Sequence, residues 1–129
     1  MEYFYSKMII NASFEEIESS VREELKQEGF GVLTEINVQQ TLKKKLDVDF
    51  KRYIILGACI PEAAYKLLQQ EVKAGVFLPC NIILEENDDE SIEVSAINPV
   101  AAFSAVDNDS IGCHLEEIQQ KLMNVIDNC

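Results

Sequence analysis

The sequence predicts an α+β fold rather than a doubly wound parallel sheet. Segments with helical periodicity and segments typical of strands follow one another in mixed order, without strict alternation. Two neighbouring strand-like segments in the second half are joined by a short polar turn, which is typical of a hairpin. The chain has 129 residues, of which 47% are hydrophobic, and no repeat or linker divides it. We therefore expect a single domain over residues 1–129.

The first half of the chain predicts two strands, each followed by a helix. Residues 3–10 are rich in aromatic and β-branched side chains, which favours a strand. A capping-box pattern at Ser13 begins a helix with an apolar stripe, and Gly29 is a natural stop for it. Residues 30–36 alternate as a half-buried strand would, and residues 38–46 carry apolar residues at helical spacing.

The middle of the chain predicts a buried strand, a third helix and an irregular strand. Residues 53–59 are apolar without alternation, which indicates a strand covered on both faces. Pro61 is suited to the first turn of a helix, which we expect to run to Gly75. Residues 76–84 are typical of a strand, but Pro79 lies inside it, so we expect an edge strand or a bulge.

The last third of the chain predicts a hairpin and a long helix. The acidic residues 85–90 form the expected turn, and residues 92–96 alternate as the returning strand. Asn98 and Pro99 are an N-cap and first-turn pair for a short helical turn. From about Ile111 to the end, apolar residues recur on one helical face that is wide enough to pack on a sheet.

Charge and hydropathy exclude several classes of partner. The net charge of −12 is poorly suited to nucleic acid or to an anionic membrane surface, because both require basic side chains. The longest apolar runs are too short to span a bilayer, and the first residues lack the pattern of a targeting signal. We therefore expect a cytoplasmic protein. The basic run Lys43, Lys44 and Lys45 is interpreted as a solvated helix face rather than an anion site.

Three segments carry a resemblance to a known family. They are Gly-Phe-Gly-Val-Leu at 29–33, Ile-Leu-Gly-Ala-Cys-Ile-Pro at 55–61 and Leu-Pro-Cys-Asn at 78–81, with further similarity at 41–43 and 96–99. The chain resembles the domain-of-unknown-function 302 family over nearly its whole length.

The resemblance implies a small α+β domain with a curved, mainly antiparallel sheet and helices on one face, in a TATA-box-binding-protein-like arrangement. It also implies a homodimer, and it implies no established activity. The family pattern usually has Asn where this chain has Ile60. That difference weakens any polar role for position 60.

The candidate site residues are Cys59, Cys80 and Asn81. Cys59 lies at a strand end just before a helix start, where the helix dipole favours a thiolate. The alternative is a small buried side chain, a common use of cysteine. Cys80 follows Pro79 in an irregular strand, which could aim it and Asn81 at a site or pack them locally. A site requires the two thiols to converge, which the sequence leaves open.

Other side chains offer weaker candidates. His114 is the only histidine, and we interpret it as a residue at the border of the last helix, with Cys113 pointing away from the apolar stripe. The four widely spaced cysteines are expected to be free thiols. The acidic turn lacks the spacing of a calcium loop. Four tyrosines could line a pocket for a flat ligand: Tyr3, Tyr5, Tyr53 and Tyr65.

Three functions are compatible with the sequence. The first is a homodimeric module that binds a small hydrophobic or thiol-reactive ligand, for which a metal or a haem is one option, through Cys59, Cys80 and Asn81. The second is a thiol-dependent enzyme or redox protein that uses Cys59. The third is a structural or interaction domain without a small-molecule site. The identity of any ligand or cofactor stays open.

Overall fold

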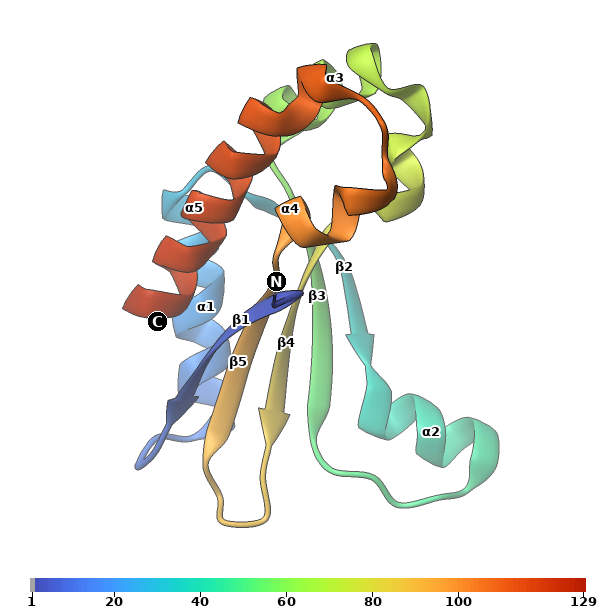
Figure 1. The fold of residues 1–129 in the computed structure, drawn as a ribbon. Coiled ribbons are helices and arrows are strands. Elements are labelled where there is room, and N and C mark those ends of the chain that lie inside the picture. Colours follow the sequence, from blue (N-terminus) through green and yellow to red (C-terminus); the bar gives the residue numbers. More distant parts are fainter. Residues whose placement is uncertain (1) are drawn as a thin grey trace.

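The computed structural model describes residues 2–129, which form a curved five-stranded antiparallel sheet with helices (Figure 1). The strand order is β1-β5-β4-β3-β2, so the N-terminal strand lies beside the last one. The strands are β1 (Phe4–Ile9), β2 (Gly31–Asn37), β3 (Tyr53–Cys59), β4 (Cys80–Glu86) and β5 (Ile92–Ile97). The helices are α1 (Phe14–Gln27), α2 (Val38–Leu46), α3 (Pro61–Gln70), α4 (Pro99–Ala102) and α5 (Gly112–Asn128).

Helix α1 forms because its start is capped and one of its faces is apolar. The Ser13 hydroxyl accepts the backbone N–H of Glu16 at 3.1 Å, and the Glu16 carboxylate accepts the backbone N–H of Ser13 at 3.4 Å. This capping box was expected from the sequence and is confirmed. Four side chains at helical spacing are buried against the sheet: Phe14, Ile17, Val21 and Leu25.

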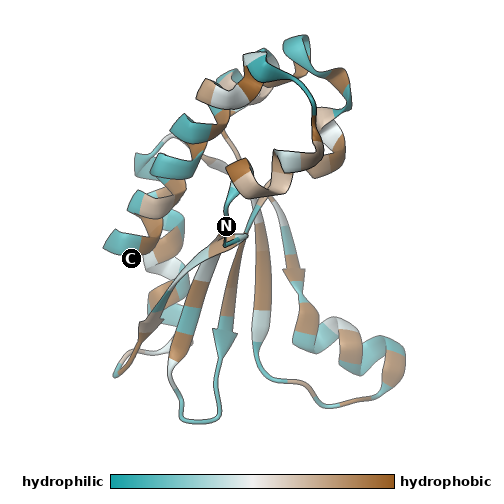
Figure 2. Cartoon of the chain, in the orientation of Figure 1, coloured by the Kyte–Doolittle hydropathy of each residue, from teal (hydrophilic) through white to brown (hydrophobic). Residues whose placement is uncertain are grey.

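Helices α1 and α5 cover one face of the sheet and form the main core with it (Figure 2). The apolar stripe predicted for the last helix is confirmed, because its side chains are buried there or in a smaller cluster at the end of the sheet. Alternate strand residues point into this core, as the two-residue period of a strand requires. The buried strand residues include Leu56, Ile82, Leu84, Val94 and Ala96.

The other face of the sheet is not covered by any helix of the described chain, and we call it the open face. Tyr53 and Ile55 of β3 point to it and are only half-buried. The sequence predicted that this strand would be covered on both faces, and for residues 2–129 that expectation is wrong. The strand therefore has the apolar composition of a two-sided core strand but only one layer of helices behind it.

The segment between α3 and β4 differs from its prediction. Helix α3 ends at Gln70, and Val72–Phe77 forms a 3₁₀ helix instead of the start of a strand. Strand β4 begins only at Cys80, and Leu78–Pro79 is a cis peptide bond just before it. Pro79 therefore removes no ladder hydrogen bond, and β4 is a central strand with partners on both sides. The first two acids of the predicted 85–90 turn belong to this strand.

The two ends of the described chain are joined by side-chain contacts. The Tyr5 hydroxyl donates to the Asp127 carboxylate at 2.6 Å. The Lys7 ammonium donates to the carbonyl oxygens of Asp127 at 3.0 Å and of Cys129 at 3.2 Å. Strand β1 is thus held on one side by β5 and behind by the end of α5.

The predicted N-cap Asn98 connects three parts of the chain. Its side-chain oxygen accepts the backbone N–H groups of Val100 at 3.1 Å and Ala101 at 3.4 Å, which caps α4. The same oxygen accepts the side-chain amide of Gln119 at 3.0 Å, and the Asn98 amide donates to the carbonyl of Glu2 at 3.0 Å.

We expect Asn98→Ala to lower the free energy of unfolding by about 1–2 kcal/mol, because it removes a helix cap and leaves its partners unpaired. Urea unfolding followed by circular dichroism measures the change. Asn37→Ala is the matched control, because Asn37 caps the exposed helix α2 with one bond, to the N–H of Gln40. An equal loss in both variants would contradict the connecting role of Asn98.

Candidate functional site

The structure brings two of the three predicted site residues together. Cys59 ends β3 and Cys80 begins β4, where Cys80 lies opposite Ala58 in the antiparallel register. Both cysteines line a hollow of about 10 Å³ between the sheet and α3, which we call the cysteine hollow. A space of that size holds at most one water molecule. Both thiols are free, as are the other two cysteines.

The surroundings of the two thiols keep them protonated. Burial raises the pKa of Cys59. Burial, with a smaller contribution from Cys59, raises the pKa of Cys80 to about 11. A nucleophilic or redox-sensing cysteine needs the opposite shift, toward the thiolate. The geometry therefore favours packed, neutral side chains and gives no support to Cys59 as a thiolate.

Asn81 points away from Cys80. Successive side chains of a strand lie on opposite faces, so Asn81 is on the open face while Cys80 is buried on the helix side. The three predicted site residues thus divide between two places. Asn81 lines a hollow of about 380 Å³ on the open face, which we call the open-face hollow.

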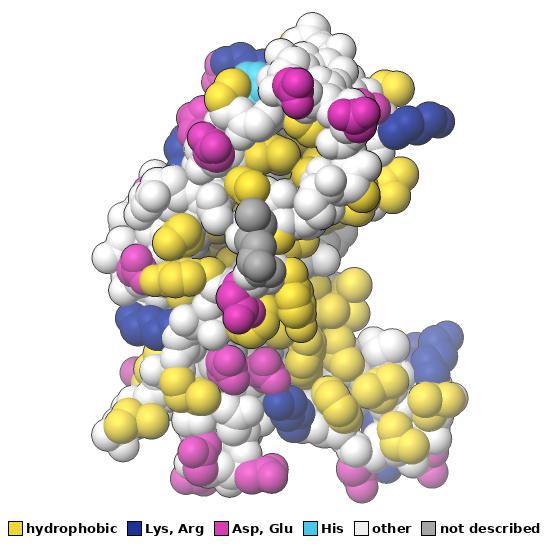
Figure 3. Space-filling view, in the orientation of Figure 1, with side chains coloured by type: hydrophobic (Ala, Val, Ile, Leu, Met, Phe, Trp, Pro, Cys, Tyr) yellow, Lys and Arg dark blue, Asp and Glu magenta, His cyan; other side chains and the backbone are white. Residues whose placement is uncertain are grey.

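The open-face hollow has an apolar floor with polar groups around it. Figure 3 shows the apolar side chains gathered in the concave surface in front of the sheet. Ile83 and Ile97 form part of the floor, and Phe4 of the edge strand closes one side. The remaining side chains at the rim are two tyrosines, two glutamates, an asparagine and a serine: Tyr3, Tyr53, Glu85, Glu93, Asn81 and Ser95.

Two polar features of the hollow bear on what it could bind. Ser95 is only 6% exposed and lines the hollow. Glu85 and Glu93 lie directly opposite each other on β4 and β5. Like charges at such a position are destabilising, so the pair needs a compensating cation.

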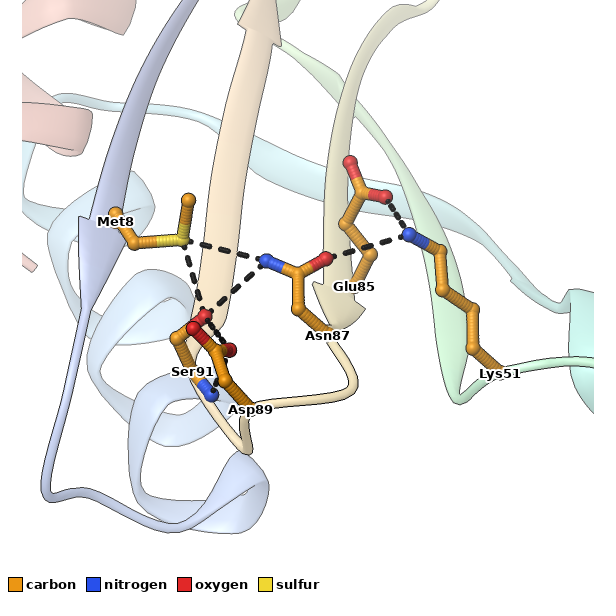
Figure 4. Close-up of polar contacts among 6 residues, drawn as sticks. All are labelled: Met8, Lys51, Glu85, Asn87, Asp89 and Ser91. Atoms are coloured by element: carbon orange, nitrogen blue, oxygen red, sulfur yellow. Dashed lines mark hydrogen bonds and ion pairs between the residues drawn. The ribbon is translucent and has the colours of Figure 1, made fainter.

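One cation, Lys51, forms an ion pair with Glu85 and also interacts electrostatically with Glu93. Figure 4 shows Lys51 in an ion pair with Glu85 and in contact with the Asn87 side-chain oxygen at 3.4 Å. The Glu85 carboxylate raises the pKa of Lys51, so the ammonium stays charged. Asn87 also donates to the Ser91 hydroxyl at 3.2 Å, which ties this end of the hollow to the β4–β5 turn. No ion pair within residues 2–129 involves Glu93.

Two of the four tyrosines line the open-face hollow, whereas the other two and the histidine lie elsewhere. Tyr3 and Tyr53 line the open-face hollow, and burial raises the pKa of Tyr53. Tyr5 bonds to the C-terminal helix, and Tyr65 is 65% exposed on α3. His114 borders a separate groove between α3 and α5, without a hydrogen bond to any thiol in the described chain. The sequence-based interpretation of His114 as a helix-border residue agrees with this position.

Residues 2–129 contain no group of three or more His, Cys, Asp or Glu side chains that could hold a metal ion. No helix in the same range has the length and apolar character needed to cross a bilayer.

Sequence reasoning missed Ser95, Glu85 and Glu93. The sequence places Glu85 in the predicted turn at 85–90, and Glu93 and Ser95 at the polar positions of the alternating strand at 92–96. The available signal was the alternation of residues 92–96, which places both residues on the face opposite the core.

The fold and the hollow define a class: an α+β protein with an antiparallel sheet, helices on one face and a partly apolar hollow on the other. Comparison with protein families matches residues 6–129 to the family described as domain of unknown function DUF302. The chain belongs to this family. A crystal structure of an uncharacterized conserved DUF302 protein from Bacillus stearothermophilus is similar, with 25% sequence identity and a TM-score of 0.92. The match covers 100% of this chain and 99% of that one. No curated protein matches the chain.

Proposed function

We propose that residues 1–129 form a single homodimeric domain that binds a small ligand in the open-face hollow. The ligand would have an apolar body and a cationic or hydrogen-bonding end. The observation that carries the proposal is the hollow itself, with the Ser95 hydroxyl and the Glu93 carboxylate beside an apolar floor.

The size and lining of the hollow support the apolar part of the ligand. Its volume of about 380 Å³ lies within the range of sites for small molecules. The floor presents Ile83 and Ile97, and the aromatic rings of Tyr3, Phe4 and Tyr53 lie around it. A flat ligand with one or two rings would bury apolar surface against these side chains.

The charges around the hollow support the cationic part of the ligand. Glu85 and Glu93 face each other, and Lys51 forms its ion pair with Glu85, although Glu93 also favours the charged form of Lys51. An ammonium or amidinium group bound near Glu93 would remove the remaining repulsion and form a charge-assisted hydrogen bond. The net charge of −12 gives further support to a cationic ligand over a phosphate or a nucleic acid.

The cysteines have a supporting role in this proposal. Asn81 and Ser95 would contact the ligand, whereas Cys59 and Cys80 would pack beneath the sheet, in a hollow of about 10 Å³. The raised pKa of both thiols leaves the enzyme alternative without support. Four free thiols are typical of a reducing compartment, which supports a cytoplasmic location.

A matched pair of probes tests the ligand site. We expect 2-phenylethylamine, which has an aromatic ring and an ammonium group, to shift the amide NMR signals of Asn81 and Ser95 in a saturable titration. Phenylacetate has a similar shape but carries the opposite charge, and it should leave these signals unchanged. Shifts by both probes or by neither would contradict the proposed site.

Charge-neutral variants provide the control. Glu93→Gln should weaken binding of the amine several-fold, since it removes the one of the two facing carboxylates that forms no ion pair within residues 2–129. Glu116→Gln makes the same change of charge on the exposed surface of α5, away from the hollow, and it should leave the affinity unchanged. Native mass spectrometry of the unreconstituted protein gives the oligomeric state and the mass of any ligand that co-purifies.

A further inference from the structure

The segment between β2 and β3, residues 38–52, leaves the body of the protein at the β2 edge of the sheet (Figure 1), and we call it the arm. Its helix α2 has nine residues and buries none of them. An isolated helix of that length is marginal in water, because helix nucleation is costly and packing normally compensates for it. A capped helix that buries none of its residues against the described chain therefore indicates that something outside residues 2–129 covers the arm.

The arm has an apolar surface that continues the open face. Leu46 is 65% exposed, Val48 43% and Phe50 42%. The Phe50 ring lies 6.0 Å from the ring of Tyr53, which lines the open-face hollow. Figure 3 shows apolar side chains both in the concave front of the sheet and on the arm. Contiguous exposed apolar patches of this kind mark interaction sites.

Charge identifies the partner. Lys44 and Lys45 of the arm form no ion pair within residues 2–129, although the protein is strongly acidic. The turn between β4 and β5 carries Asp88 and Glu90, which are exposed and also lack an ion pair in the described chain. The arm and this turn lie at the same end of the sheet, on different strands (Figure 1). One copy of the chain thus carries both the basic side chains, on the arm, and the acidic side chains, on the turn, that two copies could pair with each other.

We propose that a second copy of this chain covers the open face, with the arm of each copy lying against the β4–β5 turn of the other. A two-fold axis parallel to the strands relates two facing sheets and carries the arm from the β2 edge of one copy to the β4–β5 side of its partner. Lys44 and Lys45 then meet Asp88 and Glu90, and the apolar arm residues roof the open-face hollow.

The inference rests on the homodimer in the proposed function and adds the surface to it. It also explains why β3 has the composition of a strand covered on both faces, because the partner supplies the second layer. Two chains of net charge −12 repel each other, so a dimer needs local charge pairs to set its orientation.

Two variants with reversed charges, one in the arm and one in the β4–β5 turn, test the inference when their dimerisation is measured by sedimentation velocity. One variant carries Lys44→Glu with Lys45→Glu, and the other carries Asp88→Lys with Glu90→Lys. Each variant alone places like charges at both contacts, so its dimer dissociation constant should rise at least tenfold. An equimolar mixture restores opposite charges at both contacts and should regain the dimer.

The matched control is Lys26→Glu with Lys121→Glu, which makes the same change on α1 and α5, away from the open face, and should stay dimeric. Circular dichroism verifies that each variant is folded. A monomeric wild-type protein would overturn the homodimer and the inference together. A wild-type dimer that persists in both charge variants would overturn the inference alone, as would a mixture of the variants that fails to reassociate.

Discussion

Gly57→Ala is expected to lower the free energy of unfolding by about 2 kcal/mol, because overpacking a filled site typically costs about 1–3 kcal/mol. A Cβ atom at position 57 would lie 2.7 Å from Cγ of Pro79 and closer still to the Thr34 hydroxyl oxygen. The proline ring is rigid, and the β-branched threonine has restricted rotamers. Neither side chain can therefore move away from the added Cβ atom without a substantial cost in free energy. The gain from replacing a strand glycine, about 0.5–1 kcal/mol, only partly offsets the clash.

Gly112→Ala is the control for this prediction. A Cβ atom there meets nothing within 4 Å, and the residue already has helical backbone angles at the start of α5. Alanine should therefore be neutral or stabilise the protein by up to about 1 kcal/mol. Urea unfolding of both variants gives the comparison. A Gly57→Ala protein as stable as the wild type would show that the contact among β2, β3 and the segment before β4 is loosely packed.

Raising the pH is expected to destabilise the protein through Cys80. Its thiol has a pKa of about 11 in the folded chain, against an ordinary value of 9.0. Because the folded pKa is the higher one, the neutral thiol favours folding at every pH below 9.0, and this contribution is lost as the pH rises toward 11. Two pKa units correspond to about 2.7 kcal/mol, of which about 2 kcal/mol should be lost by pH 10.5.

The variant Cys80→Ala separates this effect from the titration of lysines and tyrosines. The free energy of unfolding of both proteins is measured at pH 8 and pH 10.5, close to the two ends of the pKa window. The wild type should lose about 2 kcal/mol more than the variant over this interval. Equal losses would show that the thiol is more accessible to water than its 5% exposure indicates.

Local sequence patterns predicted most helices and strands correctly, because helix caps and apolar periodicity depend on residues that are close together in the sequence. The capping box at Ser13, the stripe of α5 and the N-cap Asn98 were each expected and found. The strand predicted from Val76 failed for a different reason. Apolar and β-branched residues favour a strand there, but Leu78 N–H bonds to Gly75 at 3.2 Å in a turn that packs against α3. Tertiary contacts overrode propensity at this point.

The candidate site was only partly predictable, because it depends on register and on which face of the sheet has a cover. The approach of Cys59 to Cys80 requires β3 and β4 to be neighbours in one register, which no single segment encodes. The separation of Asn81 from Cys80 follows from strand alternation, but alternation does not say which face receives helices. Ser95 and Glu93 become notable only when their face is known to be the open one.

The pairing of β1 with β5 has a consequence for the order of folding during synthesis. Strands β2 to β5 form consecutive antiparallel neighbours, so they can assemble as the ribosome releases them. Of the five strands β1 is made first, yet in the described chain it pairs with β5, and Tyr5 and Lys7 bind residues near the end of α5. Strand β1 therefore has to wait until β5 and α5 have been made. Until then the edge of β5 is an unpaired strand edge, which makes the unfinished chain most prone to association at that stage.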